Sequence, residues 1–216
     1  MKTVHHQSNN RQLLVWIQDG EGVQQDFKKT ISSQSKIAKT IVSFANTKGG
    51  RIIIGVNDQG KITGVKSEEE IFMIEGAADF FSKPEVPIEF HLYEVQSKTV
   101  LVVNIPESKT KPHYAKDEDG KWWVYIRVKD QSVLASKIIV EVLKKETEKK
   151  DILIEFSCKE KALLQYLETH HRITLQEFTK LVNISRRRAT RILVNLICSG
   201  IIRSHNTEKV EFYTLA

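Results

Sequence analysis

The hydrophobic positions of the first 140 residues switch between helical and strand periodicity. Five apolar residues recur at helical spacing and form one stripe, which ends near residue 46: Ile37, Ala38, Ile41, Val42 and Ala45. After it, "RIIIGV" (51–56) predicts a buried strand, "NDQG" (57–60) a turn and "KITGV" (61–65) the hairpin partner of that strand. A second helix is predicted at about 68–82, and further strands are predicted at 88–95, 99–106 and 121–128. This pattern predicts an α+β fold.

The last sixty residues show a different pattern, in which short helices are followed by a hairpin. The helices are predicted at about 159–169, from residue 174 onwards and at 185–198, and the hairpin at 201–215. Thr174 and Glu177 have the spacing of a capping box, and Gly200 follows the end of the third helix. The order of these elements resembles a small winged helix-turn-helix domain.

The boundary between the two patterns is expected at residues 145–156. "KKETEKK" (144–150) is charged and free of apolar residues, so we expect a linker there, or an extension of the preceding helix. The predicted domains are therefore 10–144 and 157–216.

Charge is distributed unevenly along the chain. The net charge is +6, and residues 157–216 hold 10 Lys and Arg against 5 Asp and Glu, whereas residues 1–156 hold 23 against 22. This asymmetry favours a polyanionic partner, DNA or RNA, and the alternative is a basic surface that only keeps the protein soluble. The two cysteines lie far apart, and no apolar run approaches the ~18 residues of a membrane span. We therefore expect a cytoplasmic protein with no membrane contact.

The five glycines of residues 44–65 do not follow the order of a phosphate-binding loop. Such a loop lies between a strand and the N-terminus of a helix, whereas Gly49 and Gly50 follow a helix and precede a strand. A glycine at the C-terminus of a helix supplies the left-handed conformation that ends it. An ATPase is therefore disfavoured.

Three stretches together resemble the AlbA-like domain of Schlafen proteins and of many bacterial proteins. They are "GEGVQQDFK" (20–28), "FANTKGGRIIIGVNDQGKITGV" (44–65) and "KPHY…DGKWWVYIRV" (111–128). The resemblance covers roughly residues 10–140. It implies a mixed sheet-and-helix domain that binds nucleic acid.

The resemblance also implies a candidate acidic site. In the members that cleave RNA, three carboxylates bind a divalent metal, and their positions match Glu21, Asp26 and Asp58 here. Clustered carboxylates can hold Mg²⁺ or Mn²⁺, and Lys28, on the same face of an extended segment as Asp26, could contact the phosphate. The family more often has Glu where this chain has Asp26. Alternatively, Asp58 serves the turn, Asp26 and Lys28 form a surface ion pair, and Glu21 is solvated.

Four arginines lie within six residues at the start of the third C-terminal helix. On a helical wheel Arg187 and Arg191 lie opposite the apolar stripe, with Arg188 and Asn195 to one side. A recognition helix needs this arrangement, because guanidinium and amide groups bind base edges and phosphates. Arg186 lies nearer the packed edge and is expected to contact a phosphate.

The predicted hairpin would act as the wing of this domain and adds Arg203, His205 and Lys209 to the basic surface. Two other readings stay open. The arginines could simply keep an exposed helix soluble, or the domain could bind protein or dimerise through Val194 and Cys198, which are expected on its exposed side.

Our first hypothesis is a bacterial, cytoplasmic transcriptional regulator that binds DNA through the winged helix and needs no cofactor. The second is an endoribonuclease that uses Mg²⁺ or Mn²⁺ at Glu21, Asp26 and Asp58, and the third is a protein-interaction adaptor. A homo-oligomer is left open.

Overall fold

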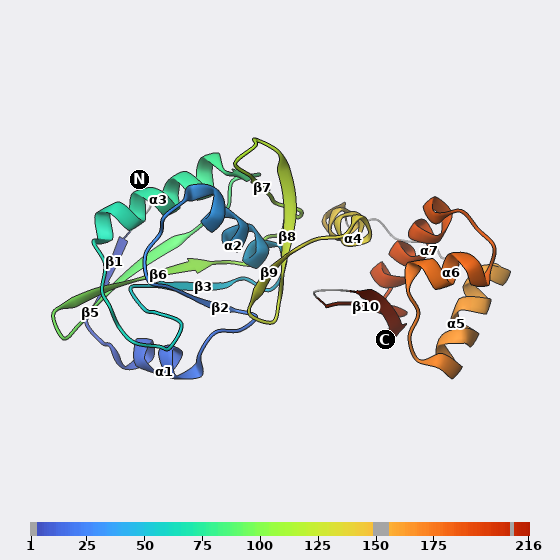
Figure 1. The fold of residues 1–216 in the computed structure, drawn as a ribbon, viewed down its shortest axis with the longest axis horizontal. Coiled ribbons are helices and arrows are strands. Elements are labelled where there is room, and N and C mark those ends of the chain that lie inside the picture. The colour runs from blue at the N-terminus through green and yellow to red at the C-terminus, as the bar shows by residue number, and fades with distance from the viewer. Residues whose placement is uncertain (1–3, 149–155, 208–209) are drawn as a thin grey trace. The chain divides into compact units, whose positions relative to one another are not determined.

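The computed structural model describes residues 4–148, 156–207 and 210–216 of the chain, which is divided into two compact units, Met1–Leu134 and Ala135–Ala216 (Figure 1). Each unit has its own hydrophobic core. No helix in these ranges combines the length and the apolar character that a membrane crossing requires.

The first unit is built on a five-stranded mixed sheet. Its strands, in the order in which they pair, are β1 (Val4–Gln7), β5 (Glu89–Val95), β6 (Lys98–Ile105), β3 (Gly50–Ile54) and β2 (Gln25–Lys28). The pairs β1–β5 and β2–β3 are parallel, and the two central pairs are antiparallel. A second, antiparallel sheet contains β4 (Ser82–Lys83), β7 (Tyr114–Lys116), β8 (Trp122–Val128) and β9 (Gln131–Leu134). The α+β class predicted from the pattern is confirmed.

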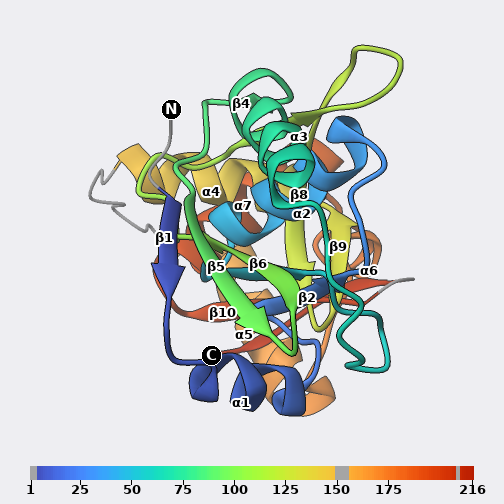
Figure 2. The ribbon, with the colours of Figure 1, turned by 90° about the vertical axis from the view of Figure 1, so that its left-hand side faces the viewer.

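Helices cover both faces of the five-stranded sheet. They are α1 (Arg11–Asp19), α2 (Gln34–Asn46) and α3 (Ser67–Phe80). Figures 1 and 2 show α1 on one face and α2 with α3 on the other. The strand β3 contributes side chains to the hydrophobic clusters on both faces of this sheet. Ile52 and Ile54 pack with α2 and α3, whereas Ile53 packs with Leu13 of α1. This double burial explains the continuous apolar run of its sequence.

The return segment of the predicted 51–65 hairpin is not a strand. Residues 57–60 form the expected turn, but only one isolated bridge, between Val56 and Ile62, follows it. Both edges of β3 are occupied by β2 and β6, so residues 61–65 have no free edge on which to pair. Gly55 and Gly64 instead take positive φ angles, and the segment crosses over the end of the strand.

The second unit contains the elements predicted for the C-terminus, in the predicted order. They are α5 (Cys158–His170), α6 (Leu175–Leu181), α7 (Arg186–Cys198) and the antiparallel hairpin of β10 (Ile202–Asn206) and β11 (Glu211–Leu215). The capping box is present: the Thr174 hydroxyl accepts a hydrogen bond from the Glu177 backbone N–H, and the Glu177 carboxylate accepts one from the Thr174 N–H at 2.8 Å. Local polar spacing thus predicted where α6 begins.

A further helix, α4 (Lys137–Glu148), belongs to the second unit and not to the domain expected at 10–144. Ile138 and Val142 of α4 pack in one buried cluster with Leu163, Phe178 and Leu193. Residues 145–148 of the expected linker form the last turn of α4, and 149–155 lie outside the described residues. The division at Leu134 follows because the apolar face of α4 is buried against α7.

This packing corrects one expectation for α7. Val194, expected on the exposed side of the helix, is only 2% exposed, and Cys198 is half-buried. The helical wheel assumes a single packed face, whereas α7 is packed both by α6 and by α4.

Candidate nucleic-acid interface

Asp26, the central residue of the predicted carboxylate trio, lies in a buried ion cluster. Its side chain is 6% exposed, and its Oδ1 accepts a hydrogen bond from Nη2 of Arg127 at 2.8 Å. Its second oxygen forms an ion pair with Nζ of Lys28. The expected ion pair between Asp26 and Lys28 is therefore present. It is not an isolated surface pair, because Asp26 also binds the buried Arg127.

Arg127 is a key residue of the first unit that the sequence interpretation missed. Its guanidinium also donates to the backbone oxygens of Gly22 and Gln25, each at 3.2 Å, and lies over the Phe44 ring at 4.8 Å. The residue is 5% exposed. The available signal was its position in β8 on the same face as Tyr125, because that face packs on α2.

The other two carboxylates of the trio are exposed and have separate surroundings. Glu21 accepts a hydrogen bond from the backbone N–H of Phe27 at 2.8 Å, and Asp58 lies in the turn after β3. Within the described ranges, no three His, Cys, Asp or Glu side chains are grouped so that they could hold a metal ion. The structure thus places Asp26 against two cations, whose charges offset that of the carboxylate.

The glycine-rich stretch serves close packing at the end of α2. Gly49 has a φ of +65°, and a Cβ built on it would lie 2.6 Å from the backbone N of Glu107 and 2.7 Å from the Ile105 carbonyl oxygen. Its N–H donates to the Phe44 carbonyl at 2.9 Å, which closes the helix. The interpretation of this glycine as a helix terminator, and not part of a phosphate loop, agrees with this geometry.

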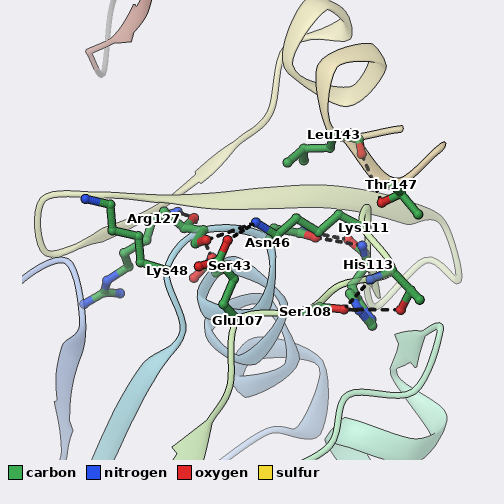
Figure 3. Close-up of polar contacts among 12 residues, drawn as sticks. Ser43, Asn46, Lys48, Glu107, Ser108, Lys111, His113, Arg127, Leu143 and Thr147 are labelled. Carbon is green, nitrogen blue, oxygen red and sulfur yellow. Dashed lines mark hydrogen bonds and ion pairs between the residues drawn. The ribbon is translucent and has the colours of Figure 1, made fainter. Parts of the chain in front are cut away.

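Asn46 joins two of the sequence stretches that carried the family resemblance (Figure 3). Its amide donates to the carbonyl oxygens of His113 and Tyr125, each at 2.9 Å, and its Oδ1 accepts from the His113 N–H at 2.7 Å. The amide is 2% exposed, so its donors and acceptor are used inside the fold. The "FANT" and "KPHY" stretches therefore satisfy polar groups of each other inside the fold.

His113 is held in one tautomer within the same network (Figure 3). Its Nδ1 lies 2.8 Å from the Pro84 carbonyl oxygen, which can only accept, so the proton is on Nδ1. Nε2 then accepts from the Ser108 hydroxyl at 2.6 Å. Burial lowers the pKa of His113, which keeps the ring neutral.

The arginines at the start of α7 are exposed, as the sequence predicted. The side chains of Arg187, Arg188 and Arg191 form no hydrogen bond or ion pair within the part of the chain that the structure describes. The helix begins at Ser185, whose hydroxyl accepts from the Arg188 N–H. Four positive groups, those of Arg186, Arg187, Arg188 and Arg191, thus project from the first two turns.

The remaining predicted contact residues differ in their surroundings. Asn195 is half-buried, and its Oδ1 accepts a hydrogen bond from Nζ of Lys145 in α4 at 2.6 Å. In the hairpin Arg203 is exposed, whereas the His205 ring stacks on Phe212 with centroids 5.0 Å apart. Lys209 lies outside the described residues. The open part of α7 is therefore its N-terminal half.

Comparison with known proteins gives two family matches. The model of the family described as "Schlafen, AlbA_2" matches residues 21–136, which is more than half of the chain and covers the first unit from residue 21 to its end. The PCI domain model matches residues 153–209, within the second unit. No curated protein is similar enough in sequence to match.

Two solved structures are similar to somewhat more than half of the chain. The DIP2311 protein of Corynebacterium diphtheriae is 15% identical with a TM-score of 0.43, and the match covers 63% of this chain and 30% of that one. The N-terminal domain of an ATP-dependent DNA helicase RecG-related protein from Nitrosomonas europaea is 22% identical with a TM-score of 0.42, covering 61% of this chain and 97% of that one.

Proposed function

We propose that this chain, which belongs to the Schlafen AlbA_2 family, is a nucleic-acid-binding protein. In this proposal its second unit is a winged helix-turn-helix domain, which binds duplex DNA and thereby regulates transcription. The observation that carries the proposal is the set of exposed, unpaired arginines on the first two turns of α7. The positive excess of the chain lies in the same unit.

The open half of α7 is the half that a recognition helix uses. In helix-turn-helix proteins the N-terminal residues of the recognition helix contact base edges, while the rest of the helix is packed behind them. Arg187, Arg188 and Arg191 are the candidates for base and phosphate contacts, because guanidinium groups bind guanine and phosphate through two parallel hydrogen bonds. Arg186, at the packed edge, and Arg203, on the hairpin, would contact the backbone on either side.

The endoribonuclease alternative has less support from the geometry. A metal bound by Asp26 would have to displace Lys28 from Oδ2, because Arg127 already holds Oδ1 in the buried cluster. The family membership is compatible with either use of nucleic acid, so the arginine surface decides which function we propose.

The proposal is tested by fluorescence anisotropy of a labelled duplex titrated with the full chain at several salt concentrations. In Arg187→Ala with Arg191→Ala, the loss of two phosphate contacts should reduce the slope of log Kobs against log[salt] by about 1.8 and weaken binding at least about tenfold. The matched control is Lys161→Ala with Arg172→Ala, which removes two charges from exposed positions elsewhere in the same unit.

The control variant should retain most of the affinity and most of the salt slope. Equal losses in the two double variants would mean that only net charge matters, and unchanged binding in the first variant would remove α7 from the interface. Either result contradicts the proposal.

A further inference from the structure

A cavity of about 630 Å³ lies alongside α4 and the first turns of α7 within the second unit. Its walls come mainly from these two helices, with Leu175 of α6 and Glu211 of β11 completing them. This size falls within the range of sites that enclose a small organic molecule. The cavity therefore requires an explanation separate from the exposed surface of α7.

The floor and the rim of the cavity differ in chemistry. Ile138, Leu175 and Val194 give an apolar floor, and they all pack with the core of the unit. The lining also includes the exposed residues Arg186, Arg187 and Arg191. A site with an apolar floor and several convergent cations fits a molecule that has an apolar body and an anionic group.

The other charges of the lining do not cancel this preference. Lys137 and Lys145 add two positive groups, so five basic residues stand against Glu141 and Glu211. Lys145 is held by Asn195, and Glu141 lies 3.4 Å from Nζ of Lys144, which offsets its charge. The lining thus keeps an excess of positive charge, and three of its five basic residues are the arginines of α7.

We infer that this cavity is a binding site for a small anionic molecule with an apolar or aromatic body, and that its occupant competes with nucleic acid. The anionic group would bind Arg187 and Arg191, and the body would cover Val194 and Ile138. The occupant would then neutralise the same arginines that the proposed function assigns to DNA. The competition rests on the proposed function, whereas binding of the small molecule does not.

The test uses 8-anilinonaphthalene-1-sulfonate, which combines an aromatic body with a sulfonate, and measures its affinity for the full chain by calorimetry. Thr190→Trp fills the cavity from α7 and removes no charge, because Thr190 lines the cavity and is half-buried. Thr169→Trp is the matched control, since Thr169 is exposed on α5 outside the cavity. Arg187→Ala with Arg191→Ala is the second test variant and leaves the core untouched.

Loss of two charge-assisted hydrogen bonds should weaken binding of the sulfonate about tenfold or more in the double arginine variant. Thr190→Trp should weaken it similarly, and Thr169→Trp should leave it unchanged. If the sulfonate binds equally well to Thr190→Trp and to the wild type, the cavity is not its site and the inference fails.

Competition is measured separately, by adding the sulfonate to a preformed complex of the chain with labelled duplex. Release of the duplex from the wild type, but not from Thr190→Trp, is the expected result. If the sulfonate binds in the cavity and the duplex stays bound, the claim of competition is overturned. If the duplex fails to bind even without the sulfonate, the DNA-binding proposal fails and the cavity result stands alone.

Discussion

Replacing Asp26 with alanine should destabilise the first unit strongly, because it leaves a buried guanidinium without its counter-ion. The side chain of Arg127 is 1% exposed and that of Asp26 6%, and their ion pair is 2.8 Å long. Removing one partner of a buried pair costs about 3–5 kcal/mol of unfolding free energy, since the other charge stays desolvated.

The remaining contacts of Arg127 do not offset this loss. The carbonyl oxygens of Gly22 and Gln25 would still accept hydrogen bonds at 3.2 Å, but they carry no net charge. Lys28, whose side chain is 37% exposed, can turn into water and adds little. We therefore expect a loss of about 3 kcal/mol, at the lower end of the range for broken buried pairs.

The assay is urea unfolding followed by tryptophan fluorescence. The three tryptophans, Trp16, Trp122 and Trp123, all lie in the first unit, so the signal reports on that unit alone. Asp58→Ala is the matched control, because Asp58 is exposed in a turn and its loss should change stability by no more than about 0.5 kcal/mol. Arg127→Met added to Asp26→Ala should recover part of the loss, since it removes the unpaired charge.

Two results would refute this reasoning. Equal stability of the Asp26→Ala and Asp58→Ala variants would mean that the ion pair contributes nothing to the fold. A gain in stability on replacing Asp26 would indicate that the carboxylate is crowded by like charges, as a metal site without its metal would be.

Four further variants have expected outcomes. Gly49→Ala should cost about 1–3 kcal/mol in the same urea assay, because its φ is +65° and its Cβ would meet backbone atoms at 2.6 Å. Gly22→Ala, where a Cβ meets nothing within 4 Å, should be nearly neutral. Hydrogen bonds from Thr174 lower the pKa of Glu177 below its ordinary 4.5, so the stability it contributes is present above pH 4.5 and is lost as the pH falls through the lowered pKa. Thermal unfolding followed by circular dichroism should therefore show a weaker acid dependence in Glu177→Gln, and Thr174→Ala should cost about 1 kcal/mol at neutral pH.

Local patterns predicted much of the fold. The helical spacing around Ile41 and the apolar run at Ile52–Ile54 correspond to α2 and β3, and the capping residues at Thr174 marked the start of α6. These elements follow from neighbouring residues alone, because helix and strand periodicities and caps extend over only a few positions. The exposure of Arg187 follows from the same kind of information.

The features that the sequence did not predict depend on contacts between distant residues. Arg127 binds Asp26 across 101 positions, and Lys145 binds Asn195 across 50. Nothing in the neighbourhood of either residue indicates its partner. The occupied edges of β3, which exclude residues 61–65, are likewise a property of the assembled sheet.

The position of α4 has a practical consequence for any shortened version of this protein. A fragment that starts at residue 157, or at the beginning of the PCI match, would lack Ile138 and Val142 and would leave Val194 uncovered. Apolar surface of this kind promotes self-association. A dimer formed by such a fragment would result from the loss of α4 and would not show the oligomeric state of the intact chain. A fragment that starts at Ala135 would retain α4, which buries this apolar surface.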